Sequence, residues 1–359
     1  MIRISQLKLP ITHTKAQLEK KIAKTLKNPG NSFTYEIKKQ SLDCRHKNDK
    51  IFVYTVDVTI RDEQKLAKKV NNNNIMLTEE KPYEFPSPGE TPLLHSPVIV
   101  GSGPAGLFCG WYLAKAGYCP IILERGEEAE KRQKTVENFW KNGVLDPESN
   151  VQFGEGGAGT FSDGKLNTLV KDPYGRNHEV LKRFVAAGAP EEIIYQQKPH
   201  LGTDVLVGIV EKMRHEIEEM GGKFCFRSKV TDLIFENNTL KEIEINNDKR
   251  IPAQVCVLAP GHSARDTFEM LQKRGVYMEP KSFAVGLRIE HPQEMINMDF
   301  YGEPENELLG AASYKVTHKC ANGRGVYSFC MCPGGYVVNA SSEPGRLAVN
   351  GMSYQARDS

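Results

Sequence analysis

Pro97-Val-Ile-Val-Gly-Ser-Gly-Pro-Ala-Gly106, followed by Ile121-Ile-Leu-Glu-Arg125, decides the fold of this chain. A short apolar strand enters a Gly-x-Gly-x-x-Gly turn, and a helix is expected to open directly after it. Glu124 stands 23 positions after Gly101, close to the roughly 20 that separate the turn from the acidic residue in dinucleotide-binding units. The pattern therefore predicts a site for an adenine dinucleotide.

Each part of this turn has a physical task. Gly103 lets the backbone approach a pyrophosphate without a Cβ in the way, and Gly106 lets the helix pack closely on the strand. The phosphates are expected at the helix N-terminus, where the first amides have no partners in the helix and the dipole favours negative charge. Glu124 is expected to accept the adenosine ribose hydroxyls. The predicted cofactor-binding residues here are Gly101, Gly103, Pro104, Ala105, Gly106, Glu124 and Arg125.

A second glycine-rich stretch runs from Phe153 to Lys165, with four glycines among the six residues 154–159. Its exposed amides would wrap an anionic or planar cofactor, whereas the alternative is a plain solvent loop. Phe153 and Phe161 flank the loop and would anchor it, which favours the cofactor interpretation. Gly156, Gly157, Gly159 and Thr160 are predicted to bind the cofactor, and Ser162, Asp163, Lys165 and Asn167 to be polar contacts beside it.

The chain continues with a helix from Thr203 to about Met220, and then three short strands at 224–227, 230–235 and 240–245. We expect these strands to be antiparallel. Residues 253–259 read as a buried parallel strand that leads to a turn at Gly261, which is also predicted to contact the cofactor. This order is typical of a flavin protein. No second Gly-x-Gly-x-x-Gly turn follows a strand, so no separate site for a tightly held nicotinamide cofactor is expected.

The N-terminal residues form a chemically distinct module. Residues 1–70 carry 16 Lys and Arg against 7 Asp and Glu, whereas the rest of the chain carries 31 against 38. The order strand, helix, strand, strand, helix predicts a small ferredoxin-like α+β domain over residues 1–78. Five prolines between Glu79 and Pro97 indicate a linker. The elements expected in the N-terminal domain span residues 2–9, 14–26, 33–37, 52–60 and 62–70.

The 359 residues are enough for two or three domains. No stretch approaches the roughly 18 apolar residues of a membrane span, and the first residues lack the apolar core of a secretory signal. The eight cysteines are scattered through a long chain, so reduced thiols are favoured over a disulfide framework. We therefore expect a cytoplasmic protein that does not contact a membrane.

Catalytic residues are harder to assign from spacing. His200 and His262 follow segments expected at the cofactor crevice and are the candidate acid/base groups, with capping or packing as the alternative. Lys165 and Arg288 are predicted to bind the substrate. For Arg288 the substrate would be anionic, and a surface ion pair is the alternative. No metal is expected. His318, Cys320, Cys330 and Cys332 leave open a zinc site, a redox-active thiol pair or a structural loop.

Seven segments of the chain are informative when taken together. The first two, 98–107 and 124–125, are shared by many flavoproteins, and they are joined by Phe-Gly-Glu-Gly-Gly-Ala-Gly-Thr-Phe-Ser-Asp-Gly-Lys-Leu (153–166). The later four are specific: Lys-Pro-His-Leu-Gly-Thr-Asp (198–204), Ala-Pro-Gly-His-Ser-Ala-Arg-Asp (259–266), Gly-Leu-Arg-Ile-Glu-His-Pro (286–292) and Cys-Met-Cys-Pro-Gly-Gly (330–335). In combination these segments resemble a bacterial family of uncharacterised FAD-dependent dehydrogenases.

The resemblance implies a Rossmann-type FAD-binding α/β domain, expected over 98–275, with an interleaved α+β substrate domain that is partly present over 276–359. It also implies that relatives continue past residue 359 and return to the FAD domain, so we expect a truncated chain that holds FAD weakly. The expected function is an FAD-dependent oxidoreductase of an unidentified small molecule, with NAD(P)H as a transient electron partner. The alternative is a flavoprotein that binds or modifies RNA through its basic N-terminal domain.

Overall fold

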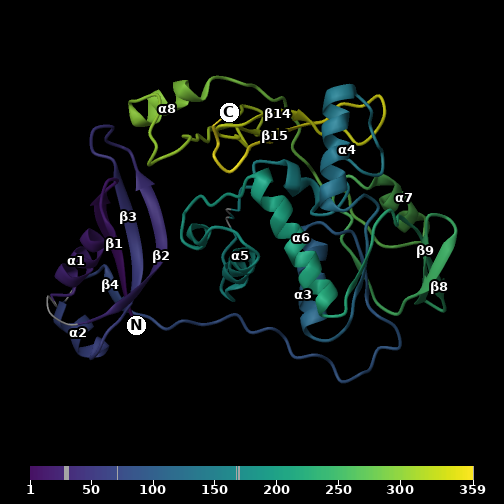
Figure 1. Cartoon of the computed structure of the whole chain (residues 1–359), viewed down its shortest axis with the longest axis horizontal. Helices are drawn as coiled ribbons and strands as arrows, with labels where there is room; N and C mark the ends of the chain where they lie inside the picture. Colours follow the sequence, from purple (N-terminus) through teal and green to yellow (C-terminus); the bar gives the residue numbers. More distant parts are fainter. Residues whose placement is uncertain (28–31, 71, 167, 169, 359) are drawn as a thin grey trace.

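The computed structural model describes residues 1–27, 32–70, 72–166, 168 and 170–358. Its N-terminal domain lies at the left of Figure 1 and is joined to the rest by a long extended segment. The domain contains the strands β1 (Ile2–Pro10), β2 (Thr34–Asp43), β3 (Ile51–Thr59) and β4 (Ile75–Leu77) and the helices α1 (Lys15–Thr25) and α2 (Glu63–Val70).

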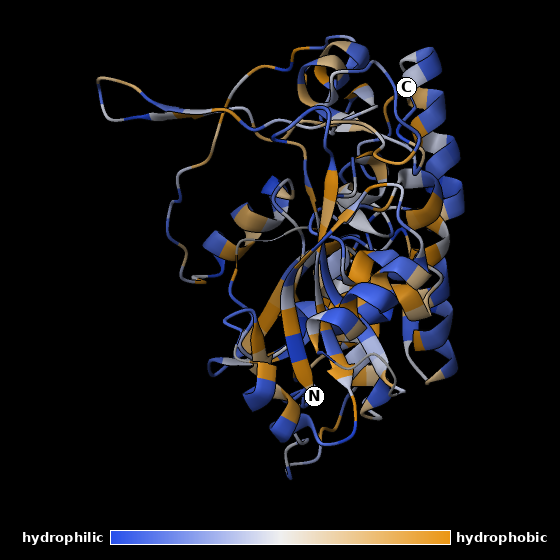
Figure 2. Ribbon diagram, turned by 90° about the vertical axis from the view of Figure 1, so that its left-hand side faces the viewer, coloured by the Kyte–Doolittle hydropathy of each residue, from blue (hydrophilic) through white to orange (hydrophobic). Residues whose placement is uncertain are grey.

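The N-terminal sheet has the antiparallel order β2-β3-β1-β4, which confirms the ferredoxin-like arrangement. Thr14 caps α1 as predicted, with its hydroxyl accepting from the Gln17 amide while the Gln17 side chain accepts from the Thr14 amide. Ile22 of α1 packs on the alternating residues of β1 and β3. Hydrophobic and hydrophilic residues follow one another along the strands of this domain (Figure 2).

Two features of this domain differ from the sequence expectation. β2 is longer than the expected strand at 33–37, because its whole length pairs with β3 across one bulge. β4 was not expected, since three residues are too few to show an alternating pattern. It closes the second edge of β1 and so completes the sheet.

Residues 78–97 contain no helix or strand. They are nevertheless held by specific contacts, two of which limit the exposed stretch 86–93. The Phe85 ring stacks on Tyr112 with 4.9 Å between centroids, and the Leu94 amide donates to the Gln254 side chain at 2.9 Å.

The N-terminal domain also contacts the rest of the chain through the edge of β2. The Gln40 amide donates to the Tyr195 carbonyl at 2.8 Å, and the Gln197 amide donates to the Gln40 carbonyl at 3.0 Å. Lys50 pairs with Glu303 at 2.8 Å. The contacts across this boundary are therefore more specific than the charge reversal and the prolines suggested.

A parallel sheet with the order β11-β5-β6-β7 forms the centre of the molecule, which confirms the Rossmann-type fold. Its strands are short and hydrophobic: β5 (Val98–Val100), β6 (Ile121–Leu123), β7 (Lys223–Cys225) and β11 (Cys256–Leu258). The helix α3 (Pro104–Lys115) follows the glycine turn, and α6 (Thr203–Glu219) lies beside it.

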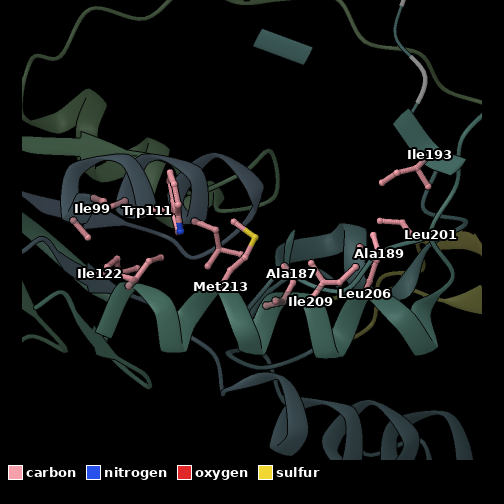
Figure 3. Close-up of a cluster of buried hydrophobic side chains, with 14 residues drawn as sticks. Ile99, Trp111, Ile122, Ala187, Ala189, Ile193, Leu201, Leu206, Ile209 and Met213 are labelled. Carbon is pink, nitrogen blue, oxygen red and sulfur yellow. The ribbon is translucent and has the colours of Figure 1, made fainter. Parts of the chain in front are cut away.

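The two faces of this sheet pack against different layers because neighbouring residues of a strand point to opposite sides. On one face, Ile99 and Ile122 pack against α3 and α6, where Trp111 and Met213 are buried (Figure 3). On the other face, Val100 belongs to a core shared with the antiparallel strands and with α7 (Arg265–Lys273).

The antiparallel layer contains β8 (Val230–Glu236), β9 (Thr239–Ile245) and β10 (Lys249–Pro252). Three antiparallel strands are present as expected, but one of them is a different segment from the one predicted. The segment 224–227 was assigned to this layer, whereas β7 joins the parallel sheet beside β6. β10 takes its place by pairing with β9.

The remaining elements are α4 (Ala129–Asn142), the 3-10 helix η1 (Gly157–Phe161), α5 (Arg176–Ala186), the 3-10 helix η2 (Glu191–Ile194), α8 (Gln293–Tyr301), β12 (Thr317–Lys319), β13 (Gly325–Tyr327), β14 (Tyr336–Asn339) and β15 (Val349–Met352). The hairpin of β14 and β15 packs on α4, with Val136, Phe161, Val338 and Met352 in a shared core.

No helix among the described residues is both long and apolar enough to cross a membrane.

Limited proteolysis tests the boundary between the two parts. We expect a protease of broad specificity to cut first between residues 86 and 93, because these residues are largely exposed and lie between the anchors at Phe85 and Leu94. Mass spectrometry of the first fragments locates the cut. First cleavage inside β1–β3 would contradict the boundary.

Candidate functional site

A cleft of about 320 Å³ opens where β5, β6 and β11 end. Ligands of open α/β sheets bind at the carboxyl ends of the strands, so this is the expected place for a dinucleotide. The cleft brings together most of the predicted cofactor residues. Those that line it are Gly101, Gly103, Pro104, Ala105, Glu124, Arg125, Gly157, Gly159 and Gly261, together with His262.

The walls of this cleft suit a pyrophosphate. A Cβ added to Gly103 would meet only the Cα of Gly157 at 3.8 Å, and one added to Gly159 or Gly261 would meet no atom within 4 Å. Backbone at these positions is therefore open to a ligand. Gly103 is the N-cap of α3 and supplies no side-chain hydrogen bond, so the first amides of α3 are available to an anion.

Three predicted cofactor residues do not line the cleft. Gly106 packs against the carbonyl of Gly101, where a Cβ would collide, so it serves the close approach of α3 to the turn. A Cβ added to Gly156 would likewise collide with the hydroxyl of Thr160. The Thr160 hydroxyl is buried and has no hydrogen-bond partner among the described residues. The contacts of these three residues with the cofactor stay predictions.

Glu124 is buried and its carboxylate joins three segments of the chain. One oxygen accepts from the amide and the hydroxyl of Ser102, at 2.9 and 2.7 Å. The other accepts from the amides of Gly126 and Gly154, at 2.9 and 3.0 Å. Because a carboxylate has about four acceptor positions, a ribose hydroxyl that reached Glu124 would share them with these donors. The ribose contact therefore stays a prediction, and the structural role is the one we observe.

Arg125 is fixed at one wall of the cleft. Its guanidinium lies over the Phe153 ring at 4.1 Å and donates to Glu148 and to both oxygens of Asp266. Burial lowers the pKa of Arg125, but the hydrogen bonds that Arg125 donates to the two carboxylates outweigh burial and raise its pKa overall. Burial raises the pKa of Asp266, but the hydrogen bonds that it accepts from Arg125 and Lys229 outweigh burial and lower the pKa to about 2. All three guanidinium nitrogens of Arg125 are therefore already engaged by carboxylates.

Arg132 of α4 was missed by sequence reasoning. It is fully buried, lies over the Phe161 ring at 4.9 Å, and donates to the carbonyls of residues 150, 151 and 155 at 2.9, 3.0 and 2.6 Å. Burial lowers its pKa to about 10, so it stays charged at neutral pH. Gly154 must pass directly over this side chain, with φ at +120°. In the sequence, Arg132 is one charge among many on a polar helix, and no signal marks it.

A second group of polar side chains surrounds Asp163, just beyond the glycine loop. Asp163 is buried and accepts from Ser353 at 2.7 Å, from Arg357 at 3.0 Å and from the Cys332 thiol at 3.4 Å. The Lys165 ammonium also contacts it. Ser162 instead bonds the Gly159 carbonyl within the loop at 2.7 Å, and Asn167 lies outside the described residues.

His200 joins this group because residues 164–166 pair with residues 199–201, with Lys165 opposite His200. Its Nε2 lies 3.4 Å from the Tyr354 carbonyl. Since a carbonyl only accepts, Nε2 carries the proton and Nδ1 is left as a base in the neutral ring. Burial and the nearby Arg357 lower the pKa of His200, which favours this neutral form.

Arg288 completes the group from the segment before α8. It donates to the Cys330 carbonyl at 3.2 Å and to the Asn350 side chain at 3.0 Å. Only Gly351 separates it from Cys332, since a Cβ there would lie 2.7 Å from the Arg288 guanidinium and 2.8 Å from the Cys332 Cβ. The structure therefore brings Lys165, His200 and Arg288 together, whereas His262 lies in the cofactor cleft and is paired with the Ser263 hydroxyl at 2.6 Å.

The zinc interpretation of the cysteines is not supported. Among the described residues, the group whose ligand atoms converge is Glu36, Glu80 and His178, and lysines already contact both carboxylates of that group. All eight cysteines are free.

Comparison with known proteins identifies the family. The family described as "FAD-dependent protein, C-terminal domain-like" matches residues 282–359, and an NAD(P)-binding Rossmann-like domain matches 99–133. A domain of unknown function matches residues 1–59. An uncharacterized protein of Clostridium beijerinckii is 48% identical over 360 residues, covering 99% of this chain and 67% of its own length.

The chain belongs to the bacterial family of FAD-dependent oxidoreductases. FAD is its cofactor, and the open backbone of the cleft fits the pyrophosphate. Two solved structures are similar over part of the chain, at TM-scores too low to inform its fold or activity. Thermovibrio ammonificans THI4 is 20% identical with a TM-score of 0.33, over 51% of this chain and 63% of that one. L-amino acid deaminase from Proteus vulgaris is 12% identical with a TM-score of 0.35, over 54% and 59%.

The substitution Gly103→Asp tests the cleft as the FAD site. The new side chain would enter open space, so the fold should be retained, while its charge repels the pyrophosphate. We expect FAD affinity to fall by at least about 100-fold, equivalent to about 2.7 kcal/mol. Flavin absorbance after gel filtration measures the bound cofactor. Gly103→Asn, of similar size but neutral, should bind FAD more tightly than Gly103→Asp, and normal flavin content in a folded Gly103→Asp protein would refute the assignment.

Alkylation at pH 8 tests whether Cys332 is a redox-active thiol. Burial and the Asp163 carboxylate raise the pKa of Cys332 to about 12, so the unreactive thiol form dominates. We expect iodoacetamide to modify the exposed Cys119 well before Cys332, as followed by peptide mass spectrometry. Labelling of Cys332 as fast as Cys119 would show a thiolate and revive the redox interpretation.

Proposed function

We propose that this protein is an FAD-dependent oxidoreductase that transforms a small molecule beside Asp163 and uses NAD(P)H as a transient electron partner. The observation that carries the proposal is the continuity of one loop. Ala158 and Gly159 line the cofactor cleft, and the same loop reaches Asp163 four residues later. A molecule held at Lys165, His200 and Arg288 would therefore lie next to the cofactor.

FAD supplies the two-electron chemistry when bound. The chain's own residues position the substrate and handle protons. Neutral His200 has a free Nδ1 that can take a proton from a substrate, and the nearby Arg357 disfavours the charged ring. The Cys332 thiol and the Tyr336 hydroxyl stay protonated because burial raises both pKa values. These two groups therefore donate hydrogen bonds and do not act as bases.

NAD(P)H is proposed as a passing partner because the Rossmann-like turn supplies one dinucleotide cleft, which FAD takes. The cytoplasm suits such a reaction, since reduced nicotinamides and reduced thiols occur together there and all eight cysteines are free.

RNA binding has weaker support. It rests on the excess of Lys and Arg in residues 1–70. Stacking on RNA bases would need exposed aromatic rings, but Tyr54 is buried in the core and bonded to Gln40 and His13.

Anaerobic titration of the FAD-loaded protein tests the proposed function. We expect NADH or NADPH to bleach the visible flavin absorbance at about one equivalent, because each delivers the two electrons that FAD accepts. Gly103→Asp protein treated in the same way serves as the flavin-free control. Flavin that dithionite bleaches but neither nicotinamide does would contradict the assignment of NAD(P)H as the partner.

A further inference from the structure

The group around Asp163 has more positive than negative charge. Lys165 and Arg357 both contact the one carboxylate of Asp163. Arg288 contacts no carboxylate among the described residues; its partners are a carbonyl, an amide oxygen and a thiol. Two cations therefore share one anion in a setting where Lys165 and Arg357 keep only 24% and 17% of their side-chain exposure. Arg288 is a third cation, beside Gly351 and Cys332.

Two buried cations of this group also have donor capacity that Asp163 alone does not satisfy. The Arg357 Nε is buried without a hydrogen-bond partner in the described part of the chain, and the Lys165 ammonium is buried with Asp163 as its sole ionic contact there. Burying charged donors without acceptors is costly, so such an arrangement is stabilised when an anion supplies the missing acceptors. Ordinary surface ion pairs do not show this combination of excess charge and buried, unused donors.

The charge around Asp163 favours a carboxylate over a phosphate. A guanidinium pairs with either anion through parallel hydrogen bonds, so the choice between them depends on the charge of the ligand. The fixed charge of Asp163 at the centre would repel a dianion more than a monoanion. The glycine backbone and helix N-terminus that suit phosphate lie instead in the cofactor cleft.

We propose that the surface around Asp163 binds a carboxylate group of the substrate, with Lys165 and Arg357 as its donors and Arg288 as a further cation. The class of substrate is thus an organic acid. This proposal rests on the proposed function, because it takes the bound carboxylate to belong to the molecule that exchanges electrons with FAD. Asp163 acts as the internal counter-ion that keeps the cations in place when the site is free.

Acetate titration at constant ionic strength tests the proposal. The probe is acetate replacing chloride, and the readout is the NMR signal of the His200 ring, assigned by its loss in His200→Gln. We expect a saturable shift in the wild-type protein. Lys165→Gln and Arg357→Gln should each weaken acetate binding by about 10- to 100-fold, as expected for the loss of one charged hydrogen bond.

The decisive comparison uses substitutions with opposite expected effects on acetate binding. Asp163→Asn removes the internal counter-ion and should tighten acetate binding, whereas a purely structural ion cluster would show no acetate dependence in any variant. Arg346→Gln removes an exposed cation from the same part of the chain and should leave acetate binding unchanged. If Asp163→Asn fails to fold, Lys165→Gln and Arg357→Gln still decide the matter.

Three results would overturn the proposal: no saturable shift with acetate, an equal effect of Arg346→Gln and Lys165→Gln, or tighter binding of inorganic phosphate than of acetate. Flavin content and reduction by NAD(P)H are measured on the same preparations. Normal flavin content and reduction without acetate binding would reject the carboxylate site and leave the oxidoreductase function standing. Acetate binding without flavin reduction would reject the proposed function and leave a carboxylate-binding site.

Discussion

The carboxylate of Glu124 is the constraint on which the cofactor cleft depends. It lies at the end of β6 and accepts from the turn after β5, at Ser102, and from the glycine loop, at Gly154. A buried carboxylate is stable only when donors surround it, and donors so enclosed need it in return. Three segments that are distant in sequence are therefore held together by one side chain.

The position of the glycine loop in turn determines where a substrate can bind. Arg132 donates to the carbonyl of Glu155 in the loop and to those of Asn150 and Val151 just before it. The β14–β15 hairpin packs against Phe161 in the second half of the loop. The loop then leads directly to Asp163, around which the chain gathers cations, a histidine and a thiol. A rigid loop with a cofactor on one side and polar side chains on the other is a suitable support for electron transfer between two bound molecules.

The sequence predicted the fold well because its main signals are local. The glycine turn, the spacing to Glu124 and the strands expected at 2–9 and 52–60 each depend on neighbouring residues, and all are present as expected. The strands at 223–252 were harder, since pairing partners are chosen by tertiary contacts that short apolar runs do not specify. β7 was therefore placed in the wrong sheet.

The candidate site was predicted in pieces. Lys165, His200 and Arg288 were each singled out, but their convergence depends on the pairing of 164–166 with 199–201 and on the close contact at Gly351. Arg132, Ser353 and Arg357 were missed because their roles come from burial and long-range partners, which leave no periodic or spacing signal. Glu124 was identified from its spacing, yet its bonds to Ser102, Gly126 and Gly154 were visible only in three dimensions.

Glu124→Gln tests the central claim most directly. The amide nitrogen of glutamine cannot accept, so at least two of the four enclosed donors lose their partner, which should cost roughly 2 to 4 kcal/mol of unfolding free energy. Urea unfolding measures this loss, and hydrogen exchange at the Gly154 amide reports on the loop itself. Our account predicts lower stability and faster exchange at Gly154. Unchanged stability together with unchanged exchange at Gly154 would show that Glu124 does not hold the loop.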